Sequence, residues 1–110
     1  MKIAVSATGG SINAKVEERF GRAPYYVIID SETMHFGLVS NPSVTSAHGA
    51  GPQTASLLAE RDVQVVLTGR VGPNARQALE GLGVKVVENV SGTVKEAATR
   101  YLATNSNQGV

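Results

Sequence analysis

The sequence has no cysteine among its 110 residues. This absence excludes a disulfide scaffold, a thiolate zinc site, a cysteine-held iron–sulfur cluster and a cysteine nucleophile. An excess of one charge is also lacking, since ten Lys+Arg against nine Asp+Glu leave a formal net charge of +1. Without a basic stripe, nucleic acid is not the expected partner. No apolar run approaches the roughly 20 residues that span a bilayer, so no membrane association is expected.

The remaining composition is that of one compact globular domain, with 42% hydrophobic and 17% charged residues. The first residues, Met1 to Ser6, run directly into a strand-like segment and contain no cleavable signal. This pattern predicts a cytoplasmic protein.

Apolar periodicity divides the chain into two unlike halves. The first half predicts three strands, over residues 2–7, 25–30 and 34–40, the last two joined by a polar hairpin link. The second half alternates helix and strand: a helix from residue 52, a strand over 63–68, a helix from residue 73, a strand over 84–87 and a last helix. Thr93 and Glu96 form a capping box before that helix, whose apolar face includes Val94, Ala98 and Tyr101. We therefore predict a single α/β domain over residues 1–104 and a flexible C-terminal tail over 105–110.

Glycine-rich segments precede each predicted helix and should meet at the carboxyl edge of the sheet. Free backbone N–H groups and the positive end of the helix dipole attract anions at such helix N-termini. Glycines that only form turns and caps are the alternative interpretation. The candidate ligand-binding residues are Thr8, Gly9, Arg22, Gly49, Gly51, Gly69, Arg70, Gly72, Asn74, Ser91, Gly92 and Thr93.

Catalytic motifs are absent from the sequence. It contains no P-loop, no dinucleotide fingerprint, no G-x-S-x-G and no H-E-x-x-H. The acidic residues, Glu88 among them, are expected on solvated faces or turns, and no pair of carboxylates is suited to acid–base chemistry. An enzyme is therefore not expected.

Two histidines and two arginines remain as candidates. His35 is expected at the surface, whereas His48 lies between Ala47 and Gly49 in a loop before a helix. His48 either hydrogen-bonds a neighbour or ligates a metal. One histidine cannot complete a mononuclear zinc site, but it could anchor a preformed cluster that brings its other ligands. Arg22 and Arg70 either clamp loops or contact an anion.

Six stretches, taken in order, resemble one known family. They are Met1–Val5, Arg19–Tyr26, Asn41–Pro42, His48–Gly51, Gly72–Ala75 and Ser91–Val94. This ordered set is similar to the dinitrogenase iron–molybdenum cofactor-binding family, which includes nitrogenase accessory proteins and the molybdenum–copper orange protein. The resemblance covers residues 1–104.

The resemblance implies a ribonuclease-H-like fold, with a mixed five-stranded sheet flanked by helices. It also implies a non-catalytic carrier for a preformed, anionic metal–sulfur cluster of molybdenum with iron or copper, bound labilely. The segments at Phe20–Arg22, His48–Gly51 and Gly72–Asn74 would border this cluster, with His48 as the metal ligand. The implied partners are a cluster donor or acceptor protein, and we expect a monomer or weak dimer. The alternative is a small regulatory or scaffolding domain that binds a partner protein or a phosphorylated metabolite.

Overall fold

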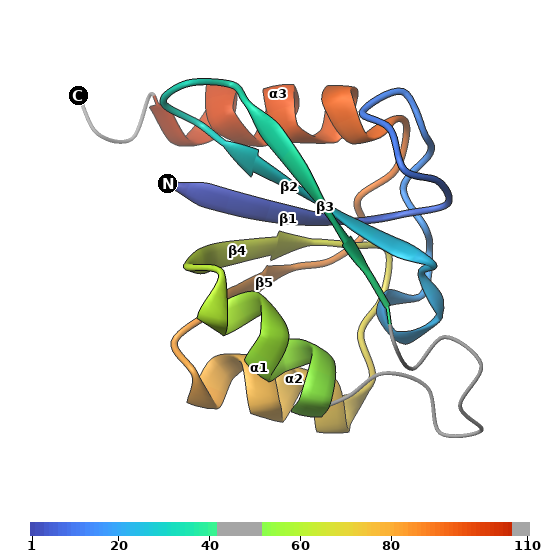
Figure 1. Cartoon of the computed structure of the whole chain (residues 1–110), viewed down its shortest axis with the longest axis vertical. Helices are drawn as coiled ribbons and strands as arrows, with labels where there is room; N and C mark the ends of the chain where they lie inside the picture. The colour runs from blue at the N-terminus through green and yellow to red at the C-terminus, as the bar shows by residue number, and fades with distance from the viewer. Residues whose placement is uncertain (42–51, 107–110) are drawn as a thin grey trace.

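The computed structural model describes residues 1–41 and 52–106 (Figure 1). Along the chain the elements are β1 (Lys2–Ala7), the 3₁₀ helix η1 (Phe20–Arg22), β2 (Tyr25–Asp30), β3 (Phe36–Ser40), α1 (Pro52–Glu60), β4 (Val63–Leu67), α2 (Pro73–Gly81), β5 (Lys85–Val87) and α3 (Val94–Ser106). The strands form one five-stranded sheet in the order β3-β2-β1-β4-β5. The predicted single α/β domain with a mixed sheet is confirmed, and the strand order is consistent with a ribonuclease-H-like arrangement.

Strand directions decide which loops meet. β1, β4 and β5 run parallel, while β2 is antiparallel to both β1 and β3. The carboxyl ends of β1, β3, β4 and β5 therefore share one edge of the sheet with the amino end of β2. Segments from both halves of the sequence converge at this carboxyl edge.

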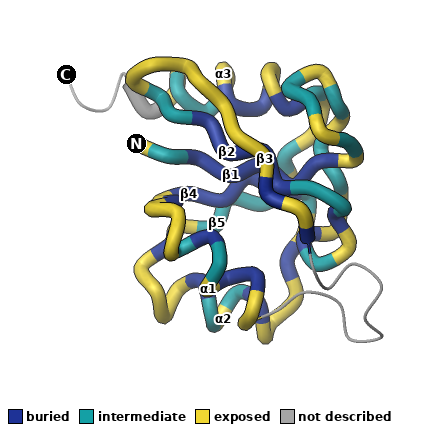
Figure 2. Tube along the Cα trace, viewed as in Figure 1, coloured by how far each residue is buried: buried dark blue, intermediate teal, exposed yellow. Residues whose placement is uncertain are grey.

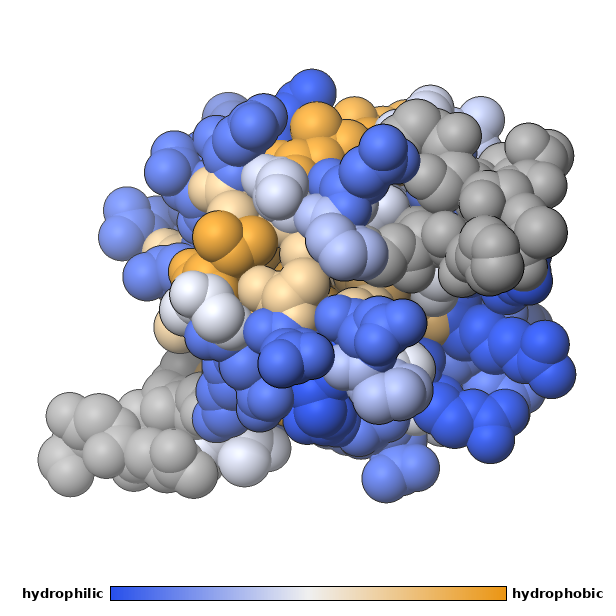
Figure 3. All heavy atoms as spheres, turned by 90° about the horizontal axis from the view of Figure 1, so that it is seen from below, coloured by the Kyte–Doolittle hydropathy of each residue, from blue (hydrophilic) through white to orange (hydrophobic). Residues whose placement is uncertain are grey.

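Helices cover the two faces of the sheet unequally. α1 and α2 lie on one face and α3 alone on the other (Figure 1). Each face has its own buried cluster, which includes Leu58 and Leu79 on the first and Val94 and Ala97 on the second. The central strands between the two layers are dark blue in Figure 2, the colour of buried residues. Seen from below, the outside of the two-helix layer is mainly hydrophilic (Figure 3).

The third strand differs from its prediction. β3 begins at Phe36 rather than Met34, because Met34 has a φ of 61° and belongs to the hairpin turn. The amide N–H of Met34 donates to the carbonyl of Asp30 at 2.7 Å. Met34, Phe36 and Leu38 are 56%, 48% and 43% exposed, because a single helix about 10 Å wide covers only part of its face of the sheet.

The last helix is longer than its apolar pattern predicts. α3 continues to Ser106, so residues 105 and 106 are helical although they were predicted to belong to the tail. Residues 107–110 lie outside the described residues. No helix within the described ranges is long and apolar enough to cross a membrane.

Candidate functional site

The loop after β4 lies against the segment that leads into η1. The N–H of Arg70 donates to the carbonyl of Glu18 at 2.6 Å, and the N–H of Phe20 donates to the carbonyl of Arg70 at 2.9 Å. A Cβ atom on Gly69 would lie only 2.5 Å from the carbonyl oxygen of Glu18. Gly69 was predicted as a ligand contact, and its position shows a structural reason for glycine: the two backbones approach too closely for a side chain.

The loops after β4 and β5 are also joined. The N–H of Asn89 donates to the carbonyl of Gly69 at 2.8 Å. The Glu88 carboxylate accepts a hydrogen bond from the N–H of Val71 at 3.0 Å and forms an ion pair with Arg76. The prediction of a solvated Glu88 is therefore wrong, since its half-buried side chain holds the turn before α2 in place.

A buried network of polar side chains holds the two ends of η1. The Tyr26 hydroxyl donates to the carbonyl of Phe20 at 2.6 Å and accepts from Nδ2 of Asn41 at 3.2 Å. The same Nδ2 donates to the carbonyl of Ala23 at 2.8 Å. The network fixes the ends of η1 and hence the backbone from which Arg22 projects. The sequence does not reveal these roles of Tyr26 and Asn41, because the carbonyls that they contact belong to another segment of backbone.

Positive charge gathers at this corner of the carboxyl edge. Arg19 and Arg70 are neighbours in an isolated parallel β-bridge, and Arg22 ends η1. All three side chains are exposed. Glu18 lies 3.8 Å from Arg70, but both side chains are well exposed, so this ion pair is weak. Arg19 was not among the predicted site residues, because only the bridge to Arg70 brings it here.

The N-terminus of α2 opens at the same corner. Its first residue, Pro73, has no N–H, and its N-cap residue, Gly72, provides no side-chain cap. Within the described part of the chain, the N–H groups of Asn74 and Ala75 have no hydrogen-bond acceptor. Such N–H groups, at the positive end of a helix dipole, suit an anion. The expectation of a free helix N-terminus holds for α2.

The N-terminus of α3 has the opposite character. The predicted capping box is confirmed, with the N–H of Thr93 on Oε1 of Glu96 at 2.9 Å and the N–H of Glu96 on Oγ1 of Thr93 at 3.1 Å. The N–H groups of Val94 and Lys95 donate to carbonyls of the loop after β1, each at 2.8 Å. The expectation of free N–H groups is therefore wrong for α3, because this loop already satisfies them.

The predicted site residues thus fall into two groups. Arg22, Gly69, Arg70, Gly72 and Asn74 lie around η1 and the start of α2, whereas Thr8, Gly9, Ser91, Gly92 and Thr93 lie around the start of α3, on the other side of the sheet (Figure 1). His48, Gly49 and Gly51 lie outside the described residues. Within the described residues, no three histidine, aspartate or glutamate side chains gather at one point to hold a metal ion.

Comparison with known proteins gives one consistent result. The family described as dinitrogenase iron-molybdenum cofactor matches residues 1–104. The apo orange protein of Desulfovibrio gigas is 44% identical, with a TM-score of 0.89 over 94% of this chain and 88% of its own. A Thermotoga protein named as a NifB candidate is 33% identical, with a TM-score of 0.82 over 93% and 87%. Protein MJ0580 of Methanocaldococcus jannaschii is 26% identical over 82% of this chain and 79% of its own length.

Replacement of Gly69 by alanine tests the close approach of the two loops. We expect Gly69→Ala to lower the free energy of unfolding by about 2–3 kcal/mol, since the new methyl group must displace the backbone of Glu18. Gly72→Ala in the same turn is the control, because no atom lies within 4 Å of the added methyl group. Urea denaturation of both variants measures the difference. Equal losses would contradict the assigned role of Gly69.

Replacement of Tyr26 by phenylalanine tests the buried network. Burial raises the pKa of Tyr26, with the Thr54 hydroxyl opposing the rise, so the phenol stays neutral in the folded chain. In the unfolded chain the Tyr26 hydroxyl ionises at about pH 10. Above this pH the free energy of unfolding therefore falls by about 1.4 kcal/mol per pH unit, because the folded chain keeps the proton that the unfolded chain loses. Tyr26→Phe should remove this slope, and it should cost about 1–2 kcal/mol at neutral pH through the lost hydrogen bonds.

Urea denaturation between neutral pH and about pH 11 measures both effects. Tyr25→Phe, at the neighbouring half-buried position, is the control. If the wild-type chain and Tyr26→Phe lose stability equally above pH 10, the network does not hold the phenol in its neutral form.

Proposed function

Since the chain belongs to the dinitrogenase iron-molybdenum cofactor family, we propose that it carries a preformed, anionic metal–sulfur cluster. The cluster contains molybdenum with iron or copper, and the chain binds it for cofactor assembly or delivery without transforming it. The cargo comes from a donor protein and passes to an acceptor protein. The orange protein and the NifB candidate, at 44% and 33% identity, support a cofactor-related role.

The observation that carries this proposal is the gathering of positive charge at one corner of the carboxyl edge. Arg19, Arg22 and Arg70 project there beside the two N–H groups at the start of α2. Of the nearby carboxylates, Glu88 is already engaged by Arg76, and Glu18 makes only a weak ion pair with Arg70. An anionic cluster neutralises this charge, and the N–H groups donate hydrogen bonds to its sulfide ligands.

The absence of cysteine fits a carrier rather than a permanent holder of the cluster. Thiolate ligands would bind the metal covalently, whereas guanidinium and N–H groups attract the whole anion and release it when an acceptor competes. Charge-based binding also weakens with salt, because ions screen the exposed arginines. The chain therefore holds its cargo labilely.

One protein ligand completes the proposal. We assign it to His48, whose imidazole replaces one outer ligand of the cluster, and we include Gly49 and Gly51 as further binding residues. The residues near the start of α3, from Thr8 and Gly9 to Ser91, Gly92 and Thr93, are secondary candidates, since the N–H groups of that helix end are already occupied.

Neutralisation of the arginines tests the charge-based capture. Tetrathiomolybdate, a coloured dianion, serves as the probe, and its binding is followed by visible absorption. We expect Arg22→Gln and Arg70→Gln each to weaken binding about fivefold, equivalent to about 1 kcal/mol for one exposed charge. Arg61→Gln is the matched control, because exposed Arg61 follows α1 at the opposite edge of the sheet.

The same titration separates the alternatives. An equal loss with Arg61→Gln would mean that the anion binds by general charge and not at the proposed corner. A chain that binds inorganic phosphate but no thiomolybdate would favour the metabolite-binding alternative and overturn the cluster carrier.

Replacement of His48 tests the metal ligand. His48→Ala should lose a bound molybdenum–copper or molybdenum–iron sulfide cluster at least about tenfold faster on gel filtration, equivalent to about 1.4 kcal/mol for one ligand bond. The melting temperature of the cluster-free chain should be unchanged within about 2 °C. His35→Ala is the control, since exposed His35 lies at the opposite edge of the sheet. Equal cluster retention by His48→Ala and the wild-type chain would remove His48 from the site.

A further inference from the structure

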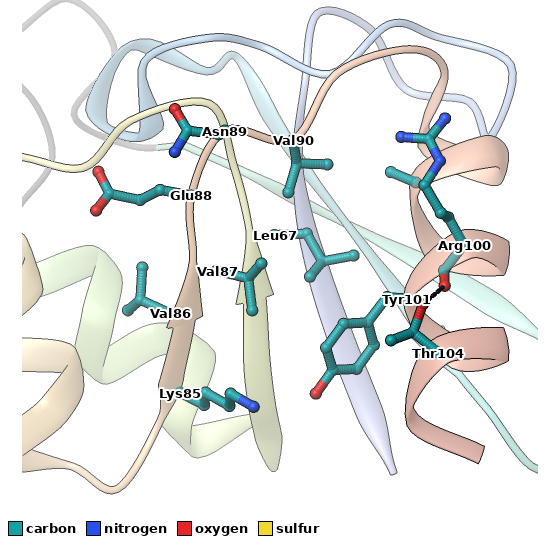
Figure 4. Close-up of a pocket in the computed structure, with 11 residues that line it drawn as sticks. Leu67, Lys85, Val86, Val87, Glu88, Asn89, Val90, Arg100, Tyr101 and Thr104 are labelled. Carbon is teal, nitrogen blue, oxygen red and sulfur yellow. Dashed lines mark hydrogen bonds between the residues drawn. The ribbon is translucent and has the colours of Figure 1, made fainter. Parts of the chain in front are cut away.

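A groove lies on the face of the sheet that α3 covers only in part. It runs between β5 and α3 and encloses about 510 Å³ (Figure 4). This volume lies within the range of about 300–1,000 Å³ that is typical of small-molecule sites. The groove follows the flank of α3, and only its upper end, at Glu88 and Asn89, touches the loops of the carboxyl edge.

The inside of the groove is apolar. Leu67 forms its fully buried floor, Val87 and Val90 line the sheet side, and the half-buried ring of Tyr101 lines the helix side. Figure 4 shows the Tyr101 ring between β5 and α3, with its hydroxyl directed toward the end of the groove where Lys85 lies. A flat apolar ring would remove this surface from water and stack against the tyrosine.

The charge at the groove is positive. Lys85 places Nζ 6.0 Å from the centre of the Tyr101 ring. No carboxylate of the described residues lies within ion-pair distance of Lys85. The carboxylate that lines the groove belongs to Glu88, which is already engaged by Arg76 and the N–H of Val71.

The second cation at the groove is less available. Arg100 lies toward the other end, one turn from Glu96 on the same helix (Figure 4). Hydrogen bonds from Thr93 lower the pKa of Glu96, and the charge of Arg100 adds to this effect. Since Arg100 has an acidic neighbour, an incoming anion is drawn to Lys85.

We infer that this groove is a second binding site, separate from the proposed cluster site, for a small aromatic molecule that carries one anionic group. The aromatic ring lies on Val87 and Val90 against Tyr101. The carboxylate or sulfonate pairs with the Lys85 ammonium at the lower end of the groove. Apolar area alone does not favour one sign of charge, so the selectivity for an anion comes from Lys85.

Three indoles of nearly the same shape test this inference by their charge. Indole-3-acetate is an anion, indole is neutral and tryptamine is a cation. Each is titrated into the ¹⁵N-labelled full chain, and amide chemical shifts are recorded. We expect indole-3-acetate to shift the amides of Val87, Val90 and Tyr101 saturably, and to bind about fivefold more tightly than indole, as one screened charge pair predicts. Tryptamine should bind more weakly than indole.

Two variants and a control assign the interaction to residues. Lys85→Gln should abolish the preference for indole-3-acetate over indole and leave indole binding unchanged. Tyr101→Leu, which keeps apolar volume, should weaken all three ligands. Lys95→Gln is the control, because exposed Lys95 lies on the flank of α3 that faces β3, outside the groove. Equal binding of the three indoles, shifts elsewhere on the chain, or the same loss with Lys95→Gln would each overturn the inference.

Discussion

The candidate site depends on one close backbone contact, between the loop after β4 and the segment before η1. Gly69 allows this contact because a Cβ atom there would lie 2.5 Å from the carbonyl oxygen of Glu18. Two backbone hydrogen bonds of Arg70, one to Glu18 and one from Phe20, then hold the two segments together. Their consequence is electrostatic: Arg19 and Arg70, 51 positions apart along the chain by their numbers, become neighbours in a β-bridge. The buried hydroxyl of Tyr26 and amide of Asn41 hold the third arginine's segment against the same corner. Removal of this contact would disperse the positive charge.

The N-termini of α2 and α3 show how tertiary contacts choose between similar local patterns. α2 and α3 each follow a glycine-containing turn, and each could offer N–H groups to an anion. The loop after β1 crosses the start of α3 and supplies carbonyl acceptors for the N–H groups of Val94 and Lys95. No segment of the described chain does the same for α2. Of these two helices, α2 combines the electrostatic attraction of the helix dipole with available donors, on the side where the arginines project.

Unequal helix cover explains the rest of the surface. Two helices share one face of the five-stranded sheet, whereas α3 alone packs on the other, against β1. A helix is about 10 Å wide and strands are about 4.8 Å apart, so one helix covers about two strands. The outer strands on this face consequently expose Phe36 and Leu38 on one flank of α3 and form the apolar groove on the other. Both features follow from the geometry of one helix on a wide sheet.

Local pattern determined the elements of this protein. The β-branched run at Val27–Ile29 and the capping box at Thr93 and Glu96 act over a few residues, so they can be identified from the sequence, as can the order of the strands and helices. The tertiary structure alone decided which candidates meet. It makes Arg19 and Arg70 neighbours, and it supplies carbonyl acceptors for the N–H groups at the start of α3. It also places the Glu88 carboxylate on the N–H of Val71. The physical reason is range. Periodicity and capping report interactions within one or two turns of chain, whereas backbone contacts between distant loops depend on strand directions and on the space that a missing Cβ leaves.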